Sequence, residues 1–448
     1  MVRRTNSTET EATSRALSPS HIRRVLISGA GISAPVIAFW LAKAGMHVTI
    51  VERSENIRPG GHIISLAAPG VEVLEFMGLN DQLQDRMTKQ AGIEFRNTQN
   101  QLRGRFPVGD HGLSFTSRVE IVRSELAKLL YEASLSDQVE YVFGDSIDSI
   151  NEREDSIQVT LKNDKSRIME YDILIVAEGT YSTTRSKVFK EDIRAPLSHS
   201  DQYIALFSYK ADPAEMNDPW GYWYHIPNCP CVIVRPDGAG NMRVMIVGTR
   251  AGKIAQMLTT SQVPEENKKD YLIDLYQGTG WQAKKIIEAI KGADDLYFQR
   301  IVKANCGTWS KGRVVLVGDS GYCPSALTGM GTTVALVGAY VLAGKIVEHQ
   351  TDHSAAFSAY EELLRGPMET VHTPLGYPWI GCPESYLGIF FLHLFLQLLG
   401  YIQSSKPFHF VCHLKEKFSA PTTLQIPDPS SFAEHATPQV PIGVINAA

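Results

Sequence analysis

A glycine-rich turn followed by an acidic residue marks the part of this sequence best suited to binding a dinucleotide. The turn reads Gly-x-Gly-x-x-Ala at Gly29, Gly31 and Ala34, and Glu52 and Arg53 follow it. In such a turn the first glycine permits a tight bend, the second lets the backbone approach a pyrophosphate, and a small third residue keeps the helix close to the strand. A carboxylate about 20 residues further on accepts hydrogen bonds from ribose hydroxyls and repels a 2′-phosphate. The spacing therefore predicts binding of FAD or NAD rather than NADP.

Two later segments also carry polar residues at the ends of apolar runs. The first is Glu178-Gly179 within AEGTYSTTR, and the second is Asp319 within GDSGYCPSALTGMG. Gly331 and Thr332 then open a helix of small residues. An acidic residue at a strand end beside a helix start indicates a second helix N-terminus that faces a ligand. The alternative for Asp319 is a simple helix N-cap.

These residues need parallel strands and helices to position them. Short apolar runs at 25–29, 47–51, 171–177 and 313–317 are typical of buried parallel strands. Helical patterns run from the glycine turn to Lys43 and over 332–346. The first strand, helix and second strand form a βαβ unit, so an α/β fold with a Rossmann-like domain is predicted.

A second region, from 197 to 295, alternates apolar and polar residues as antiparallel strands do, and 101–115 shows the same alternation. Its aromatic cluster at 220–224 could wall an aromatic substrate, with half of the cluster facing the core as the alternative. His225, His111 and Tyr224 are candidates for acid–base chemistry, and a structural role is the alternative for each. Arg105 and Arg235 could bind a carboxylate or phosphates, unless they are solvated surface arginines.

With these motifs in this order, residues 22 to about 365 resemble the class A FAD-dependent monooxygenases, the group of aromatic hydroxylases and tetracycline destructases. The resemblance implies a GR2-type FAD-binding domain, as in para-hydroxybenzoate hydroxylase, interleaved with an α+β substrate domain on a mixed sheet and followed by C-terminal helices. It also implies that Arg123, in VRSELAKLL, contacts FAD and that Gly61 lies beside the flavin ring. Asp319 would bind the ribityl or ribose part of FAD, and Gly331 and Thr332 would meet the flavin ring.

The activity implied by this resemblance is monooxygenation with FAD, O2 and NADPH or NADH as a transient reductant. A flavin hydroperoxide would transfer the oxygen, so no catalytic triad or metal cluster is needed, and the sequence contains none. The expected substrate is a bulky aromatic or polyketide-type molecule of secondary metabolism or an antibiotic, which is hydroxylated or epoxidised. The sequence departs from the family at Glu178, where Asp is usual, and at Thr333 and Gly338, where Asn and Asp are usual.

Two other functions compete with this reading. A flavin-dependent halogenase is one, because residues 222–227 resemble the Trp-x-Trp-x-Ile-Pro of those enzymes, although tyrosines occupy both tryptophan positions. A flavin-binding accessory protein without turnover is the other, and the altered Glu178 motif favours it slightly.

Composition narrows the function classes further. The 448 residues have a formal net charge of −5, which gives no basic footprint for nucleic acid. The six cysteines are too few for a disulfide scaffold, and the first twenty residues lack the apolar core of a signal peptide, so a cytoplasmic protein with reduced thiols is expected. The apolar stretch 386–402 favours a buried C-terminal helix, with peripheral membrane contact as the alternative.

The predicted organisation interleaves two domains between flexible tails. The predicted segments are a tail at 1–20, FAD-binding parts at 21–95, 117–194 and 299–365, substrate parts at 96–116 and 195–298, a helical region at 366–420 and a tail at 421–448.

Overall fold

The first of two large sheets contains the four predicted buried strands and two further strands that the sequence analysis did not predict. The computed structural model describes residues 21–58, 60–109, 115–248, 265–280, 282–372 and 381–403. Six strands run in the order β17-β18-β11-β1-β2-β7, and all neighbours are parallel except β17 and β18. Their bounds are Arg24–Ser28 (β1), His47–Glu52 (β2), Val139–Phe143 (β7), Ile173–Val176 (β11), Ser310–Lys311 (β17) and Val314–Leu316 (β18).

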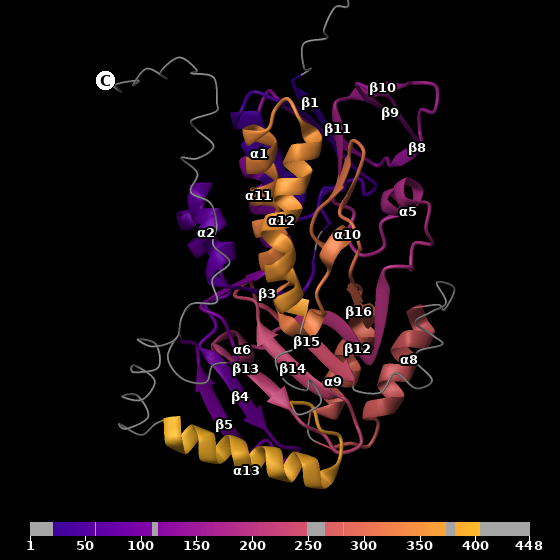
Figure 1. Ribbon diagram of the computed structural model, residues 1–448. Helices are drawn as coiled ribbons and strands as arrows, with labels where there is room; N and C mark the ends of the chain where they lie inside the picture. The colour runs from indigo at the N-terminus through magenta and orange to yellow at the C-terminus, as the bar shows by residue number, and fades with distance from the viewer. Residues whose placement is uncertain are drawn as a thin grey trace, which may run out of the picture.

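Helices pack beside this sheet and bury its apolar side chains. Helix α1 (Ser33–Lys43) lies against α11 (Gly331–Glu348), and α12 (His353–His372) packs on α11 (Figure 1). Helix α11 is the one described helix that is long and apolar enough to cross a membrane, yet 78% of it is buried inside the protein. It is therefore a core helix of this domain. The remaining helices on this side are α2 (Ala68–Phe76), α3 (Asn80–Arg86) and α4 (Arg123–Ser134).

The second large sheet is mixed and draws its strands from two separate stretches of the chain. Its order is β16-β12-β15-β14-β13-β4-β5, and only β13 and β4 are parallel. Helices α8 (Glu265–Tyr276) and α9 (Ala283–Gly292) bury Leu272 and Ile290 in its core. The strands are β4 (Gly92–Arg96), β5 (Leu102–Pro107), β12 (Leu197–Lys210), β13 (Trp220–Tyr224), β14 (Cys231–Pro236), β15 (Asn241–Gly248) and β16 (Tyr297–Ala304). This sheet contains the predicted alternating segments, while the domain boundaries remain predictions.

Two small sheets and several short elements complete the described fold. Strand β3 (Ile63–Leu66) pairs with β6 (Val119–Val122). The other elements are β8 (Ile147–Glu152), β9 (Ile157–Leu161), β10 (Met169–Tyr171), α5 (Thr183–Phe189), α6 (Pro213–Met216), α10 (Asp319–Tyr322) and the 3-10 helix η1 (Ala326–Thr328).

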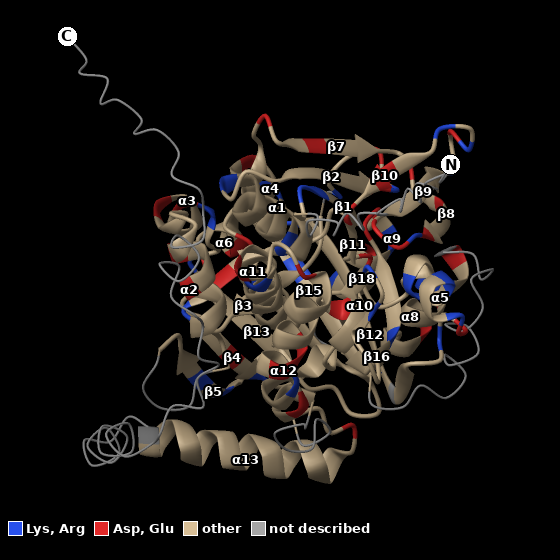
Figure 2. Cartoon of the chain, turned by 45° about the horizontal axis from the view of Figure 1, so that its top comes forward, with Lys and Arg blue, Asp and Glu red and all other residues tan. Residues whose placement is uncertain are grey.

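The C-terminal helix α13 (Tyr386–Gln403) corrects the expectation of a buried helix. It forms where the apolar stretch predicts it, but it lies along the edge of the molecule beneath β5 and β4 (Figure 1). Only one side is buried, through Ile389, His393 and Leu396. The expectation was wrong because hydropathy gives no information about how many sides of a helix find a partner. Charged side chains are spread over the rest of the molecule, but α13 carries none (Figure 2).

Candidate functional site

A cavity of about 2720 Å³ lies between the two large sheets and receives residues from both. Ordinary small-molecule pockets measure about 300–1,000 Å³, so this cavity has room for a dinucleotide together with a second molecule. Ten of the eleven residues predicted to bind the cofactor line it, and Ala34 lies just behind them. The ten are Gly29, Gly31, Glu52, Arg53, Gly61, Arg123, Glu178, Asp319, Gly331 and Thr332.

The glycine turn has the close approach that its sequence predicts. Gly29 has a φ of +96°, and a Cβ placed there would lie 2.7 Å from the carbonyl oxygen of Ala177. At Gly31 a Cβ would meet only that same oxygen, at 4.0 Å, so its backbone faces open space. Ala34 is fully buried and lets α1 pack closely on the sheet. No side chain caps the N-terminus of α1 and its first turn has no acidic residue, which leaves its N–H groups available to an anion.

Glu52 lies at the end of β2 and is held by the glycine turn. Its carboxylate accepts hydrogen bonds from the backbone N–H groups of Ala30, at 2.8 Å, and Ser54, at 3.0 Å. These contacts fix the carboxylate at the cavity wall beside Arg53. The position fits a group that accepts hydrogen bonds from a ribose.

A second uncapped helix N-terminus reaches the same cavity. Gly331 and Thr332 line it at the start of α11, where no side chain caps the helix and the first turn has no acidic residue. The next residue, Thr333, is fully buried, and its hydroxyl accepts a hydrogen bond from the Ala67 N–H at 3.1 Å. This contact ties α11 to the start of α2. Two long helices thus direct partial positive charge at one cavity.

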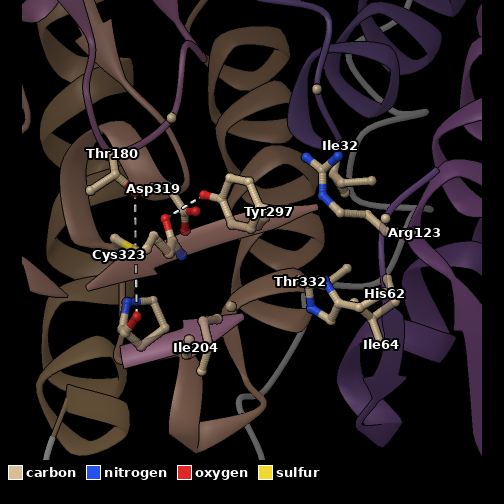
Figure 3. Close-up of a pocket in the computed structure, with 18 of the residues that line it drawn as sticks. Ile32, His62, Ile64, Arg123, Thr180, Ile204, Tyr297, Asp319, Cys323 and Thr332 are labelled. Atoms are coloured by element: carbon tan, nitrogen blue, oxygen red, sulfur yellow. Dashed lines mark hydrogen bonds between the residues drawn. The ribbon is translucent and has the colours of Figure 1, made fainter. Parts of the chain in front are cut away.

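Asp319 faces the cavity from the first position of α10, shortly after β18. Burial raises the pKa of its carboxyl above the usual value, although the Cys323 thiol and the Arg123 charge oppose the shift. Figure 3 shows Asp319, Tyr297 and Cys323 on one side of the cavity and Arg123 and His62 on the other. An acidic and a basic residue therefore face each other across this part of the cavity.

His62 is a cavity residue that the sequence reasoning missed. It follows the Gly60-Gly61 turn, and its carbonyl oxygen accepts a hydrogen bond from the Arg123 N–H at 3.0 Å. Burial, reinforced by the charges of Arg123 and Arg235, lowers the pKa of His62 to about 4. A Cβ at Gly61 would lie 3.3 Å from the Cβ of Arg123, so this turn and α4 are in close contact. The only sequence signal was the position of His62 directly after the two glycines.

Glu178 is fully used in holding the local structure together. Its carboxylate accepts hydrogen bonds from the hydroxyls of Ser28, at 2.5 Å, Ser182, at 2.7 Å, and Thr184, at 2.5 Å, and from the Thr184 N–H at 2.9 Å. Burial by itself raises the pKa of this carboxyl, but these hydrogen bonds outweigh burial and hold the pKa below its usual value. The carboxylate joins β1 to the start of α5.

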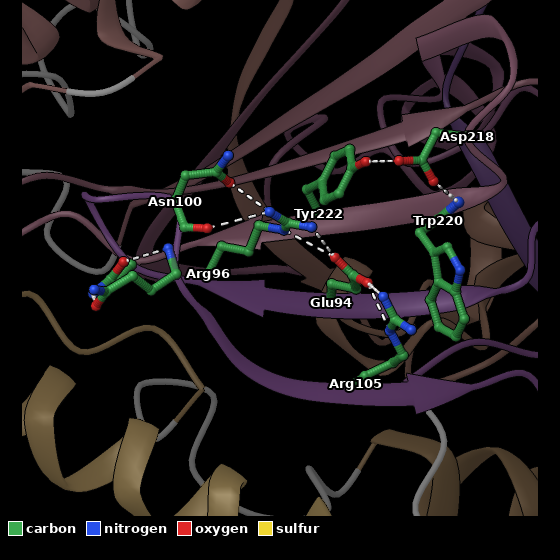
Figure 4. Close-up of polar contacts among 9 residues, drawn as sticks. Glu94, Arg96, Asn100, Arg105, Asp218, Trp220 and Tyr222 are labelled. Carbon is green, nitrogen blue, oxygen red and sulfur yellow. Dashed lines mark hydrogen bonds and ion pairs between the residues drawn. The ribbon is translucent and has the colours of Figure 1, made fainter. Parts of the chain in front are cut away.

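The two candidate arginines lie in ion pairs. Arg235 lines the cavity, where its guanidinium donates to Gln90 at 2.8 Å and to Glu120. Burial lowers the pKa of Arg235 to about 10. Arg105 is outside the cavity lining, and it pairs with Glu94 and covers the ring of Trp220 on the mixed sheet (Figure 4). Arg105 is therefore a structural residue in this arrangement.

The aromatic cluster of β13 divides between the two faces of its sheet. Trp223 lines the cavity, whereas Tyr222 and Tyr224 line a smaller pocket with residues of α6 and α9. His225 is absent from both linings. Its Nε2 lies 2.8 Å from the Gly381 carbonyl oxygen, and its Nδ1 lies 3.4 Å from Nε2 of His393 on α13.

This placement gives no support to acid–base catalysis by His225 or Tyr224. His225 is buried between the mixed sheet and α13, and burial lowers its pKa to about 4. Burial raises the pKa of the Tyr224 hydroxyl above its usual range. His111 lies outside the described residues. No group of three or more His, Cys, Asp and Glu side chains that could hold a metal occurs within the described ranges.

The part of the cavity formed by the mixed sheet combines an apolar patch with polar side chains, which are Ser198, His199, Ser200, Gln202, Arg235, Gln299 and Lys303. Strands β12, β14, β15 and β16 turn alternate side chains toward it, so the lining is set by the period of two in a strand. Gln299 lines the cavity and accepts a hydrogen bond from the Tyr297 hydroxyl. The apolar residues here are Ile204, Leu206, Ile233, Met245, Val247 and Ile301, with Phe115 and Trp223 beside them.

Comparison with known proteins agrees with this geometry. The family model for an FAD binding domain matches residues 23–363. Monooxygenase CTB7 of Cercospora beticola is 33% identical over 392 residues, which cover 85% of this chain and 92% of that protein. FAD-dependent monooxygenase asL4 of Sarocladium schorii is 34% identical over 333 residues, which cover 73% of this chain and 76% of that protein.

Solved structures resemble the chain over most of its length. Tetracycline destructase Tet(51) has a TM-score of 0.68 at 25% identity, covering 91% of this chain and 100% of that one. Klebsiella pneumoniae HpxO, complexed with FAD and uric acid, has a TM-score of 0.65 at 18% identity, covering 87% of this chain and 96% of that one. At 18% identity, the similarity to HpxO supports only the fold of this chain and not its activity or substrate.

The family match and the two monooxygenase relatives confirm the resemblance drawn from the motifs. These relatives favour oxygenation over the halogenase alternative. The glycine turn and the uncapped N-termini of α1 and α11 fit the binding of FAD. The chain belongs to the class A FAD-dependent monooxygenases.

Proposed function

We propose that this protein uses NADPH or NADH and O2 to hydroxylate or epoxidise a bulky ring compound of the aromatic or polyketide type. The observation that carries the proposal is the single cavity of about 2720 Å³, with a dinucleotide cradle at one end and an apolar sheet wall at the other. A cofactor and a large substrate can therefore lie in contact within one cavity.

The residues proposed to hold FAD fall into two groups. Gly29, Gly31 and the N-terminus of α1 would bind the pyrophosphate, and Glu52 with Arg53 would bind the adenosine end. Asp319, Arg123, Gly61 and the Gly331–Thr332 backbone would hold the ribityl chain and the ring, while Glu178 acts through the turn that it stabilises. When bound and reduced, FAD supplies the activation of O2.

The chain itself would orient the substrate and exclude water. The wall of β12, β14, β15 and β16 offers apolar contacts together with hydrogen-bonding side chains, which suits a large ring system that carries polar substituents. The charge of Arg235 is already paired with Glu120, so it does not demand an anionic substrate. The similarity to a tetracycline destructase supports a substrate of this size.

The test is reconstitution of the purified full chain with FAD, followed by a panel of phenolic and polyketide compounds under labelled O2. We expect NADPH or NADH to bleach the flavin, air to restore it, and a product to gain one labelled oxygen atom. FAD that neither nucleotide reduces would instead support the accessory-protein alternative. A chlorinated product that requires chloride would support the halogenase alternative.

A pair of variants tests which wall binds the substrate. Met245 is half-buried in the apolar wall, and Met245→Trp is expected to raise KM at least about tenfold by filling that space while FAD content is unchanged. Met216→Trp makes the same change at a residue that is 65% exposed on α6 and leaves KM unchanged. Equal KM values for the two variants would exclude this wall as the substrate site.

A further inference from the structure

Helix α13 exposes an unusually large apolar surface. Eight of its large apolar side chains are between 52% and 77% exposed. Soluble proteins rarely expose a contiguous apolar patch of this kind unless it contacts a partner or a membrane. We call these residues the apolar face of α13: Tyr386, Leu387, Phe390, Phe391, Leu394, Phe395, Leu398 and Tyr401.

The opposite side of the helix is firmly docked, so this face has a fixed direction. Leu396 packs with Phe95 and Phe106 of the mixed sheet, and a Cβ at Gly104 of β5 would lie 3.3 Å from the Leu396 Cβ. His393 adds its contact to His225. Because the sheet holds this side, the apolar face points away from the protein.

We propose that the apolar face of α13 lies in the surface of a lipid bilayer that contains anionic lipids. The proposal goes beyond the monooxygenase function and does not depend on it.

Three features favour lipid over a protein partner. The helix has no Asp, Glu, Lys or Arg, whereas protein interfaces normally carry arginine and a polar rim around their apolar centre. Tyr386 and Tyr401 stand near its two ends with Phe and Leu between them, and tyrosine prefers the level of the lipid headgroups. The helix forms a ridge at the lower edge of the molecule in Figure 1, where a flat surface can reach it.

Charge adds a fourth feature. The sequence that directly follows the helix, 404–420, contains three lysines and one glutamate. Basic residues beside an apolar interfacial helix attract anionic headgroups. At 18 residues the helix is about 27 Å long, and its docked side prevents it from spanning a bilayer, so it would lie in the plane of the membrane.

The test is co-sedimentation of the full chain with vesicles of phosphatidylcholine containing about one quarter phosphatidylserine. The test variant combines Leu387→Gln, Phe391→Gln and Phe395→Gln, all on exposed positions. The matched control combines Leu135→Gln, Ile168→Gln and Met216→Gln, which are exposed apolar residues on other elements. We expect the wild type and the control to pellet with vesicles, and the test variant to partition at least about tenfold less.

Several results would overturn the proposal. One is a wild-type chain that stays in the supernatant, and another is a test variant that pellets as well as the control. A wild type that is dimeric by light scattering and becomes monomeric in the test variant, without pelleting, would assign the face to a second copy. Pelleting that begins only after removal of residues 404–448 would assign it to the chain's own C-terminal segment.

Discussion

The contact between His225 and His393 predicts that acid weakens the docking of α13. His225 Nε2 donates to the Gly381 carbonyl oxygen, which leaves Nδ1 to accept from His393 Nε2, and both rings are then neutral. Protonation of His225 at Nδ1 would remove that acceptor and place positive charge beside His393. The other charged group near the pair is Arg103 on β5, which disfavours a charged His393 further.

The magnitude follows from the pKa of His225, which burial lowers from 6.5 to about 4. This difference is about 3 kcal/mol of preference for the neutral ring. Because the opened state binds more protons between these two pH values, the docked state keeps its stability above about pH 6.5 and loses it as the pH falls toward 4. Between pH 7 and pH 5 the loss from His225 alone is about 2 kcal/mol, or about twentyfold in the opening equilibrium.

Hydrogen exchange of the amides in α13 measures this opening directly. After correction for intrinsic exchange rates, we expect protection of residues 386–403 to fall at least about twentyfold from pH 7 to pH 5, because the lowered pKa of His393 acts in the same direction. The double variant His225→Gln with His393→Gln keeps neutral hydrogen-bonding side chains and should lose most of this pH dependence. His47→Gln changes an exposed histidine and should retain it. A double variant that loses as much protection as the wild type would contradict this prediction.

Three further changes test the site. Gly29→Ala is expected to weaken FAD binding at least about tenfold in a fluorescence titration, because the added Cβ would lie 2.7 Å from a carbonyl oxygen. The control Gly45→Ala places its Cβ in open space and should keep the affinity for FAD. Equal losses of affinity in the two variants would count against the close approach at Gly29. Glu178→Gln is expected to lower the unfolding free energy by about 2 kcal/mol near neutral pH. The difference should shrink as the pH falls below 4.5, because the unfolded state then binds a proton that the native carboxylate still resists; thermal unfolding across pH checks this, and a constant difference would contradict it. Glu120→Gln leaves the buried Arg235 guanidinium without its carboxylate partner and should lower the unfolding free energy by about 3 kcal/mol. Adding Arg235→Leu to this variant should recover most of that free energy in the same unfolding assay. If the double variant recovers none, burial of the unpaired charge is not the cause of the loss.

Much of the cofactor end could be predicted from sequence because its requirements are local. The turn at Gly29 needs a positive φ and no Cβ, and the carboxylate of Glu52 must stand at the end of the next strand. Both requirements act over a few residues and leave a readable spacing. Four of the strands in the first sheet were equally clear, since strands buried on both sides are apolar throughout, whereas the half-buried parallel strand β7 was missed.

The substrate end was harder to predict because it depends on which way each strand faces. The alternation in β13 separates Trp223 from Tyr222 and Tyr224, but either set could have faced the cavity. The face was decided by β13 pairing with β4, a partner more than 100 residues earlier in the chain. His225 illustrates the same limit, because its partner His393 comes from a helix whose docking no local pattern reveals.

Glu178 shows how one added methylene can change the role of a carboxylate without changing its charge. Four hydrogen bonds converge on its two oxygens from β1 and the start of α5, so little acceptor capacity remains for a nucleotide. An aspartate at this position would be one carbon shorter, and the same donors would be harder to reach. The longer side chain still lines the cavity, but its acceptor oxygens are turned to the donors that hold the turn beside Gly29. Rigidity of the cradle, rather than direct contact with a reductant, is the role that this geometry supports for Glu178.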